Sequence, residues 1–228
     1  MNRTDHKFVF AVHKLPGLLE RLVNQYHVLQ IDHQRDFLYR TTYLDSPEFI
    51  FFNQHINGKL PRFKVRYRLY EHSGQSFLEV KRKTNKNNTI KTRIEANLRE
   101  NNFNSQETGF IKDHIPVDDL ILKPILTTSF VRLTLVGLET LERITLDYNL
   151  SFSNSTGKVI ELPLLAVAEL KTKRFHNQSA FSKLLKEFSI RQTGFSKYSI
   201  GISLLYNLPK QNKLKRKFLL INRIESES

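Results

Sequence analysis

The feature of this sequence that most restricts its fold is an alternation of charged and apolar residues with a period of two. Between residues 63 and 70, Lys64, Arg66 and Arg68 occupy alternate positions, and large apolar residues fill the positions between them. Successive side chains of a β-strand point to opposite faces of the sheet. The segment is therefore predicted to be a strand with one charged face and one apolar face.

The same alternation recurs in other segments, so we expect many strands of this kind. The charged residues that share one parity within their strands are Glu79, Lys81, Lys83, Lys91, Arg93, Glu95, Arg132, Arg143, Asp147, Glu169, Lys171 and Lys173, and Lys7 with Asp5 in a short first strand. A solvent-exposed face explains any single strand. It explains the whole set poorly, because exposed faces usually mix both signs of charge and include many Ser, Thr and Gln, whereas this parity is mostly cationic with a few carboxylates. We therefore expect a closed antiparallel β-barrel with a polar, cationic lumen.

Helices are expected to flank this barrel, which makes the fold class α+β. Apolar spacing predicts a helix from Leu15 to Leu29, and Pro47 and Gly58 suit the two ends of a helix over residues 46–57. Two more helices are predicted, one after Asn177 and one capped by Ser196. We expect one domain over residues 1–208, followed by a basic tail at 209–228 that is a solvated extension.

Composition restricts the chemistry that this chain can perform. Its 228 residues contain no cysteine, which excludes disulfides, thiolate zinc sites and a cysteine nucleophile. A cytoplasmic location is therefore expected, with the basic tail as a candidate contact for a separate membrane protein or an acidic membrane surface. The net charge of +14 attracts polyanions over a long range.

Cations that converge on one lumen repel each other strongly unless a polyanion neutralises them. A phosphate chain suits such a lumen, because Arg and Lys form charge-assisted hydrogen bonds with phosphate oxygens. Among the few carboxylates, Glu169 could hold Mg²⁺ or Mn²⁺, and the alternative is an ion pair with Lys171. Ser196 could hold a phosphate at a helix N-terminus or serve only as a cap, and Lys197 would extend the same cationic site.

Taken together, these segments resemble the catalytic domain of the vacuolar transporter chaperone (VTC) family, the polyphosphate polymerases among the triphosphate tunnel metalloenzymes. The resemblance covers about residues 3 to 206. It rests on Lys7, Arg66-Tyr67-Arg68, residues 78–83, Lys91-Thr92-Arg93, residues 142–147, residues 168–171 and Phe195-Ser196-Lys197-Tyr198.

The resemblance implies transfer of the ATP γ-phosphate onto a growing polyphosphate chain, with one Mn²⁺ or Mg²⁺ held by Glu169. The phosphate ligands that it implies are Lys7, Arg66, Arg68, Lys83, Lys91, Arg132, Arg143, Ser196 and Lys197, and parity adds Lys81, Arg93 and Lys171. The residues expected to act in catalysis are Arg66, Arg68, Lys83, Lys91, Arg143 and Glu169.

Two departures from the family pattern change the expectation. The superfamily usually has a pair of alternating glutamates before its first lysine, whereas this chain has at most Asp5, which disfavours a two-metal triphosphatase. Polymerases of the family often have a basic residue where this chain has Gly194. Weaker binding of the growing chain is therefore expected.

Two alternatives to the polymerase remain open. The same lumen could hydrolyse tripolyphosphate or nucleoside triphosphates, or it could bind polyphosphate without turnover. Nucleic acid is not expected as a partner, because the aromatic residues Tyr67 and Tyr70 lie on the opposite parity from the cations or at a strand end. The eight histidines show no metal-ligand spacing.

Overall fold

The computed structural model describes residues 4–86, 88–98, 103–117, 119–172, 179–209 and 211–226. Lys173 and Asn177 lie outside these ranges. The strands are β1 (Thr4–Ala11), β2 (Tyr26–Val28), β3 (Asp36–Asp45), β4 (Arg62–Tyr70), β5 (Gln75–Lys83), β6 (Thr89–Glu95), β7 (Lys123–Gly137), β8 (Arg143–Ser153), β9 (Val159–Leu162) and β10 (Leu165–Thr172). The α-helices are α1 (Leu15–Leu22), α2 (Ile50–Ile56), α3 (Ser105–His114), α4 (Ala180–Glu187), α5 (Lys197–Leu205) and α6 (Lys215–Glu225).

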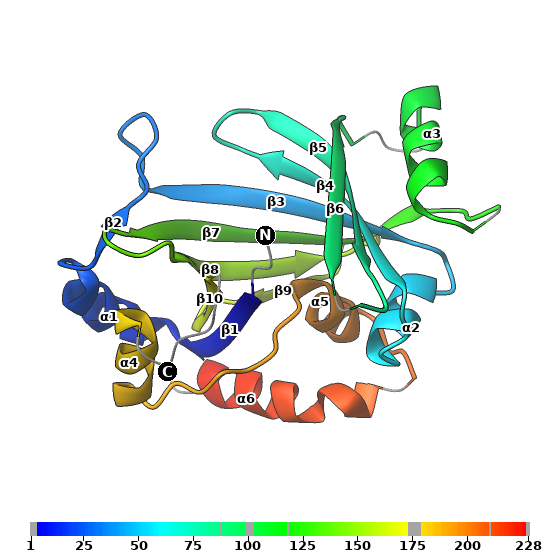
Figure 1. Cartoon of the computed structure of the whole chain (residues 1–228). Coiled ribbons are helices and arrows are strands. Elements are labelled where there is room, and N and C mark those ends of the chain that lie inside the picture. The colour runs from blue at the N-terminus through cyan, green and yellow to red at the C-terminus, as the bar shows by residue number, and fades with distance from the viewer. Residues whose placement is uncertain are drawn as a thin grey trace.

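All ten strands form one antiparallel sheet, which confirms the α+β class (Figure 1). The strand order is β1-β10-β8-β7-β3-β4-β5-β6, with β2 paired to β7 and β9 paired to β8. The predicted closure of the barrel is not formed by hydrogen bonds among the described residues, because β1 and β6 end the path unpaired with each other. The sheet is therefore not closed into a barrel by backbone hydrogen bonds between β1 and β6.

Two apolar clusters hold helices against the sheet. One packs α1 and α4 on the even-numbered side chains of β1, β8 and β10, and it includes Leu18, Phe181 and Phe10. The other packs α2, α3, α5 and α6, and it includes the odd-numbered side chains Phe63, Val65 and Tyr67 of β4. The apolar parity predicted for these strands is thus buried under helices, which leaves the charged parity on the opposite face of each strand.

The helix predicted from Leu15 to Leu29 is shorter than expected. It ends at Leu22, after which β2 pairs with β7 through the register of Tyr26 with Gly137. The buried Tyr26 hydroxyl also donates a hydrogen bond of 2.5 Å to Glu142. Strand pairing and this buried hydrogen bond therefore override the helical periodicity of residues 23–29.

The helix expected over residues 46–57 begins later, at Ile50. Asp45 still stabilises its first turn, because its carboxylate accepts hydrogen bonds of 2.9 Å from the backbone N–H groups of Phe51 and Phe52. The same carboxylate accepts a hydrogen bond of 2.6 Å from the Tyr198 hydroxyl. Asp45 thus ties the start of α2 to α5.

The tail after residue 208 is not the solvated extension that its charge predicts. Residues 211–214 form a short 3₁₀ turn, and α6 follows it and lies along the lower edge of the molecule in Figure 1. Leu214, Ile221 and Ile224 are buried in the core shared with α2 and α5. The apolar face of α6 therefore packs against the domain and holds the basic segment there. None of the helices in the described part of the chain is long and apolar enough to cross a membrane.

Candidate polyanion site

The charged parity of the strands forms one continuous surface, which we call the cationic face. Its cations are Lys7, Lys64, Arg66, Arg68, Lys81, Lys91, Arg132, Lys171 and Lys197. The ladder sets Arg66 of β4 opposite Glu79 of β5, and Thr145 of β8 opposite Glu169 of β10. The register thus places Arg66 beside Glu79 on the parity that was predicted to carry charge.

Each of three carboxylates on this face is held between two cations. Arg66 donates to Glu79 through Nε at 2.7 Å and Nη2 at 2.6 Å, and Lys91 pairs with the other oxygen of the same carboxylate. Arg132 binds Asp147 with two hydrogen bonds of 2.6 and 2.8 Å.

The remaining pairs complete the pattern. Lys197 is the second cation that pairs with Asp147. Glu169 lies 3.8 Å from the Lys7 Nζ and 3.3 Å from the Lys171 Nζ. The alternative reading of Glu169 as a partner of Lys171 is therefore seen in the structure.

All three carboxylates are held in the ionised form. Burial alone would raise the pKa of Glu79, but Arg66, Arg68 and Lys91 outweigh it and lower the pKa to about 2. Burial likewise opposes ionisation of Glu169, yet Lys7 and Lys171 lower its pKa to about 2. Asp147, between Lys197 and Arg132, also has its pKa lowered against burial. These three negative charges neutralise only part of the cationic face.

Three further cations on the face form no ion pair with a carboxylate among the described residues: Lys64, Arg68 and Lys81. Burial, followed by repulsion from Arg66, lowers the pKa of Lys81 to about 8 and that of Arg68 to about 10. Burial and the charge of Lys7 lower the pKa of Lys64 well below its usual value. Uncompensated buried charge of this kind favours a bound anion.

The two ends of the sheet face each other across this surface. The charges of Lys7 and Glu169, on β1 and β10, act on Lys81 of β5. The Lys64 Nζ on β4 donates a hydrogen bond of 3.0 Å to Ser196, and the Lys7 Nζ on β1 donates one of 2.9 Å to the adjacent Phe195 carbonyl. The sheet therefore curves far enough to bring β1 and β4, which are not paired with each other, to one common segment.

Ser196 is the N-cap of α5, as predicted, because its hydroxyl oxygen accepts a hydrogen bond from the Ser199 backbone N–H. The same oxygen accepts the Lys64 ammonium. The Lys197 Nζ lies 4.1 Å from the centroid of the Phe130 ring in addition to pairing with Asp147. The α5 N-terminus thus joins the cationic face.

The other predicted site residues lie at its margins. Arg143 is exposed at the start of β8, in register with Lys171 of β10. Arg93 is exposed, with its guanidinium 4.3 Å from the centroid of the Phe77 ring. Lys83 is half-buried near the end of β5, opposite Arg62. The structure brings none of these three into an ion pair with the central carboxylates.

Sequence reasoning did not select several residues that the structure places at the site. Glu79 and Asp147 had been placed on this parity but had been given no role, although they hold four of the cations. Tyr39 stacks on Phe130 with ring centroids 5.6 Å apart, and the Arg132 guanidinium lies 5.0 Å from the Tyr39 centroid. Opposite charges at facing register positions could have identified the ion pairs, but no signal in the sequence identifies the aromatic stack.

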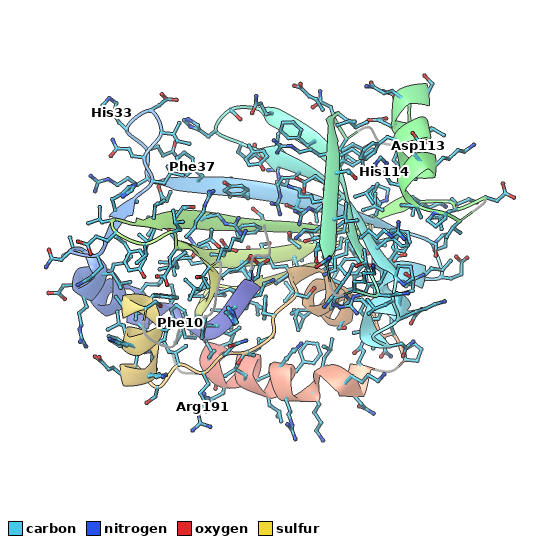
Figure 2. The ribbon with its side chains drawn as sticks, viewed as in Figure 1. Phe10, His33, Phe37, Asp113, His114 and Arg191 are labelled. Atoms are coloured by element: carbon cyan, nitrogen blue, oxygen red, sulfur yellow. The ribbon has the colours of Figure 1, made fainter. Side chains whose placement is uncertain are left out.

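Glu169 is the group best suited to a metal ion. Among the described residues no group of three or more His, Asp or Glu side chains could hold one. His33 and His114 lie toward opposite ends of the molecule in Figure 2, so they share no site. A single ionised carboxylate nevertheless suits Mg²⁺ or Mn²⁺, because such ions commonly take one or two carboxylates together with phosphate oxygens and water.

Comparison with known proteins places this geometry in a family. Residues 2–206 match the VTC domain model, whereas no curated protein matches the chain. A suspected adenylate cyclase from Bacillus halodurans has a TM-score of 0.58 at 17% identity, covering 91% of this chain and 100% of that chain. A suspected adenylyl cyclase from Hippeastrum, described as having a dominant triphosphatase activity, has a TM-score of 0.57 at 15% identity, with coverage of 92% and 99%.

At these identities the two structures show that this chain shares their fold. The match to the family model extends over all ten described strands and over α1 to α5, and α6 lies beyond it. This chain belongs to the VTC domain family.

Proposed function

We propose that this protein is a metal-dependent polyphosphate polymerase that transfers the ATP γ-phosphate to a growing polyphosphate chain within a basic tunnel. The observation that carries the proposal is the set of half-buried cations, Lys64, Arg68 and Lys81, that have no carboxylate partner among the described residues. Membership of the VTC domain family supports the same chemistry. A polyphosphate chain and ATP both supply the negative charge that this face lacks.

The chain's own residues would act mainly by positioning and by stabilising charge, since phosphoryl transfer requires little covalent chemistry from a protein. A terminal oxygen of the polyphosphate chain attacks the γ-phosphorus, the bond from that phosphorus to the β–γ bridging oxygen breaks, and ADP leaves. Lys81 and Arg68 bind oxygens of the transferred group. Arg66 and Arg132 are oriented for the same task by Glu79 and Asp147.

Glu169 would hold the Mn²⁺ or Mg²⁺ ion that accompanies the nucleotide. When bound, such an ion neutralises charge that develops on the phosphate oxygens. Lys7 and Lys171 keep Glu169 ionised, so its oxygens can bind a cation at neutral pH. The pairs with these lysines would loosen when the ion binds, since metal and ammonium compete for the same oxygens.

The second candidate is hydrolysis of tripolyphosphate or a nucleoside triphosphate on the same face. It is favoured by the triphosphatase activity described for the Hippeastrum protein, which shares the fold. A binding module that holds polyphosphate without turnover is the third candidate. Both would use the same cations, so only the products distinguish the three.

The test is incubation of the purified protein with ATP and Mn²⁺ or Mg²⁺, with ADP, free phosphate and acid-labile polymer measured side by side. Polymer formed in step with ADP supports the polymerase. Free phosphate without polymer identifies a hydrolase, and polyphosphate binding without turnover identifies the binding module. Either of the last two results overturns the proposal.

A further inference from the structure

A cavity of about 170 Å³ lies between α2, α5 and the C-terminal segment that precedes and begins α6. His55 comes from α2, Ser196 and Ser199 come from the start of α5, and Lys213 and Lys217 come from the C-terminal segment. The volume exceeds the share of one water molecule several times. The cavity is therefore large enough for a polar group, and it is separate from the central carboxylates.

No carboxylate lines this cavity, although two lysines do. Lys217 is half-buried, and it forms no ion pair within the described part of the chain. Burial and the charge of Lys7 lower its pKa. The Lys213 Nζ has only long contacts, of 3.4 Å each, to the Ile56 carbonyl and the Asn57 side chain. Both ammonium groups can accept an anion as partner.

His55 adds a donor without adding charge. Burial, together with the charges of Lys64, Arg62 and Lys217, lowers its pKa to about 2, so the imidazole is neutral. Its Nδ1 is buried and has no hydrogen-bond partner. A neutral imidazole can donate one hydrogen bond from the nitrogen that carries its proton. The imidazole therefore adds a neutral polar group, and no positive charge, to the lining of the cavity.

This cavity adjoins the cationic face. Ser196, which lines it, accepts the hydrogen bond from Lys64 of that face. Lys7 binds the carbonyl of the neighbouring Phe195 and lowers the pKa of Lys217. Only the short segment from Gly194 to Lys197 separates the two sets of cations, so one extended anion could reach both.

The Lys217 ammonium lies beside Gly194. A Cβ built at Gly194 would lie 4.0 Å from the Lys217 Nζ, an ordinary van der Waals distance. The absence of a basic side chain at position 194 led us to expect weaker binding of a chain. The helix α6, which lies beyond the matched residues 2–206, instead places an ammonium beside that position.

We infer that the cavity between α2, α5 and α6 binds phosphoryl groups of a linear polyphosphate chain that continues beyond the cationic face. Lys217 and Lys213 neutralise them, and Ser199 and His55 supply neutral hydrogen bonds. The inference rests on the proposed function for the identity of the ligand. It assigns to α6 a binding role in addition to its packing.

The experiment compares Lys217→Gln with Lys215→Gln, since Lys215 is exposed on the same helix and does not line the cavity. Affinities for tripolyphosphate and for a medium-length polyphosphate are measured by calorimetry without metal or ATP. Tripolyphosphate is short enough to be bound by the cationic face alone. We expect Lys217→Gln to weaken the longer chain by about tenfold, the effect of losing one charged hydrogen bond. Tripolyphosphate affinity should change by less than about twofold, and Lys215→Gln should change neither.

Equal affinities of Lys217→Gln and Lys215→Gln for the longer chain would overturn the inference, and so would an equal loss for both ligands. Lys213→Gln, an exposed change that spares the core, should reproduce the selective loss in smaller measure. Failure of the polymerase proposal looks different, because it appears as absence of polymer from ATP while the wild-type chain still binds polyphosphate. The two ideas can therefore fail separately.

Discussion

Glu169 differs from the other two carboxylates of the cationic face in exposure and in the length of its contacts. The Glu79 side chain is 0% exposed and that of Asp147 is 3%, whereas that of Glu169 is 18%. The closest cation to Glu169 lies at 3.3 Å, compared with 2.6 Å for Arg66 at Glu79 and for Arg132 at Asp147. Glu79 and Asp147 thus orient arginines, whereas Glu169 is the carboxylate that would exchange an ammonium for the metal ion of the proposed function.

This difference predicts the effect of Glu169→Gln. Metal-dependent turnover should fall by about 100-fold or more, since a neutral amide is a poor ligand for a hard cation. Affinity for tripolyphosphate without metal should stay the same or rise, because one negative charge is removed. Turnover assays and metal-free calorimetry measure the two effects. Glu161→Gln, at an exposed position of β9, is the matched control and should change neither. Full turnover by Glu169→Gln would exclude Glu169 as the metal ligand.

Lys81 illustrates a conflict between stability and binding at a single position. Its ammonium is buried beside Arg66 and lacks an ion pair among the described residues. Lys81→Met removes this charge while keeping the aliphatic stem. It should stabilise the free protein by about 1 kcal/mol, which corresponds to a rise in Tm of roughly 2–4 °C.

The same substitution should weaken tripolyphosphate binding by about tenfold, because one charge-assisted hydrogen bond is lost. Thermal unfolding and calorimetry measure the two effects. Lys112→Met, at an exposed position of α3, removes the same charge away from the site and serves as the control. A Lys81→Met protein that is less stable than the wild type, with unchanged affinity, would show that Lys81 has a structural role instead.

At the scale of the element, the period-two alternation predicted the strands well. Apolar spacing and capping residues predicted the bounds of the helices less well. Alternation in β4 and β5 is decided by local backbone geometry, so the burial of Val65 and Val80 on one face follows from the sequence. The early end of α1 at Leu22 depends on pairing between β2 and β7, which are far apart in the sequence.

The structure of the basic segment after residue 208 likewise depends on tertiary contacts. Lysines at 213, 215 and 217 suggested a solvated segment, but Leu214, Ile221 and Ile224 form one buried face. Strand parity grouped the charged residues by face, as in the register of Arg66 with Glu79. It could not show which cations are already neutralised, because that requires the distances between side chains from different strands.

The packing of α6 leads to a stability prediction. Ile221→Ala removes a fully buried side chain from the core shared with α2 and α5, and should destabilise the protein by about 2–5 kcal/mol. Leu219→Ala on the same helix changes a side chain that is 60% exposed and should cost less than about 0.5 kcal/mol. Chemical denaturation of both variants measures the difference. Similar stabilities for the two would contradict the packing of α6 described here.

For the whole molecule, the cationic face carries more cations than carboxylates. This excess makes the stability of the free protein and its binding of an anion depend on pH in opposite directions. Lys81 has a usual pKa of 10.5 in the unfolded chain and about 8 in the folded protein, because burial and Arg66 disfavour its charge. Between these values the unfolded state binds more protons than the folded state. The free energy of unfolding must therefore rise as the pH increases through this window. The rise should end near pH 10, where buried tyrosines such as Tyr198, whose pKa is raised by burial and by Asp45, begin to favour the unfolded state.

A bound polyanion reverses this dependence, since it requires Lys81 in the charged form. Thermal unfolding at pH 7.5 and at pH 9.5, with and without tripolyphosphate, separates the two effects. The free protein should be more stable at the higher pH, while the stabilisation given by tripolyphosphate should be smaller there. Lys81→Arg keeps its charge throughout this range, so it should lose the part of both dependences that Lys81 contributes. Lys197, whose pKa burial also lowers to about 8, still titrates in the variant. Comparison with this variant also cancels the titration of the ligand itself. Wild type and Lys81→Arg with the same pH profile would mean that Lys81 is not the titrating cation of the site, and that the excess of buried charge lies elsewhere on the cationic face.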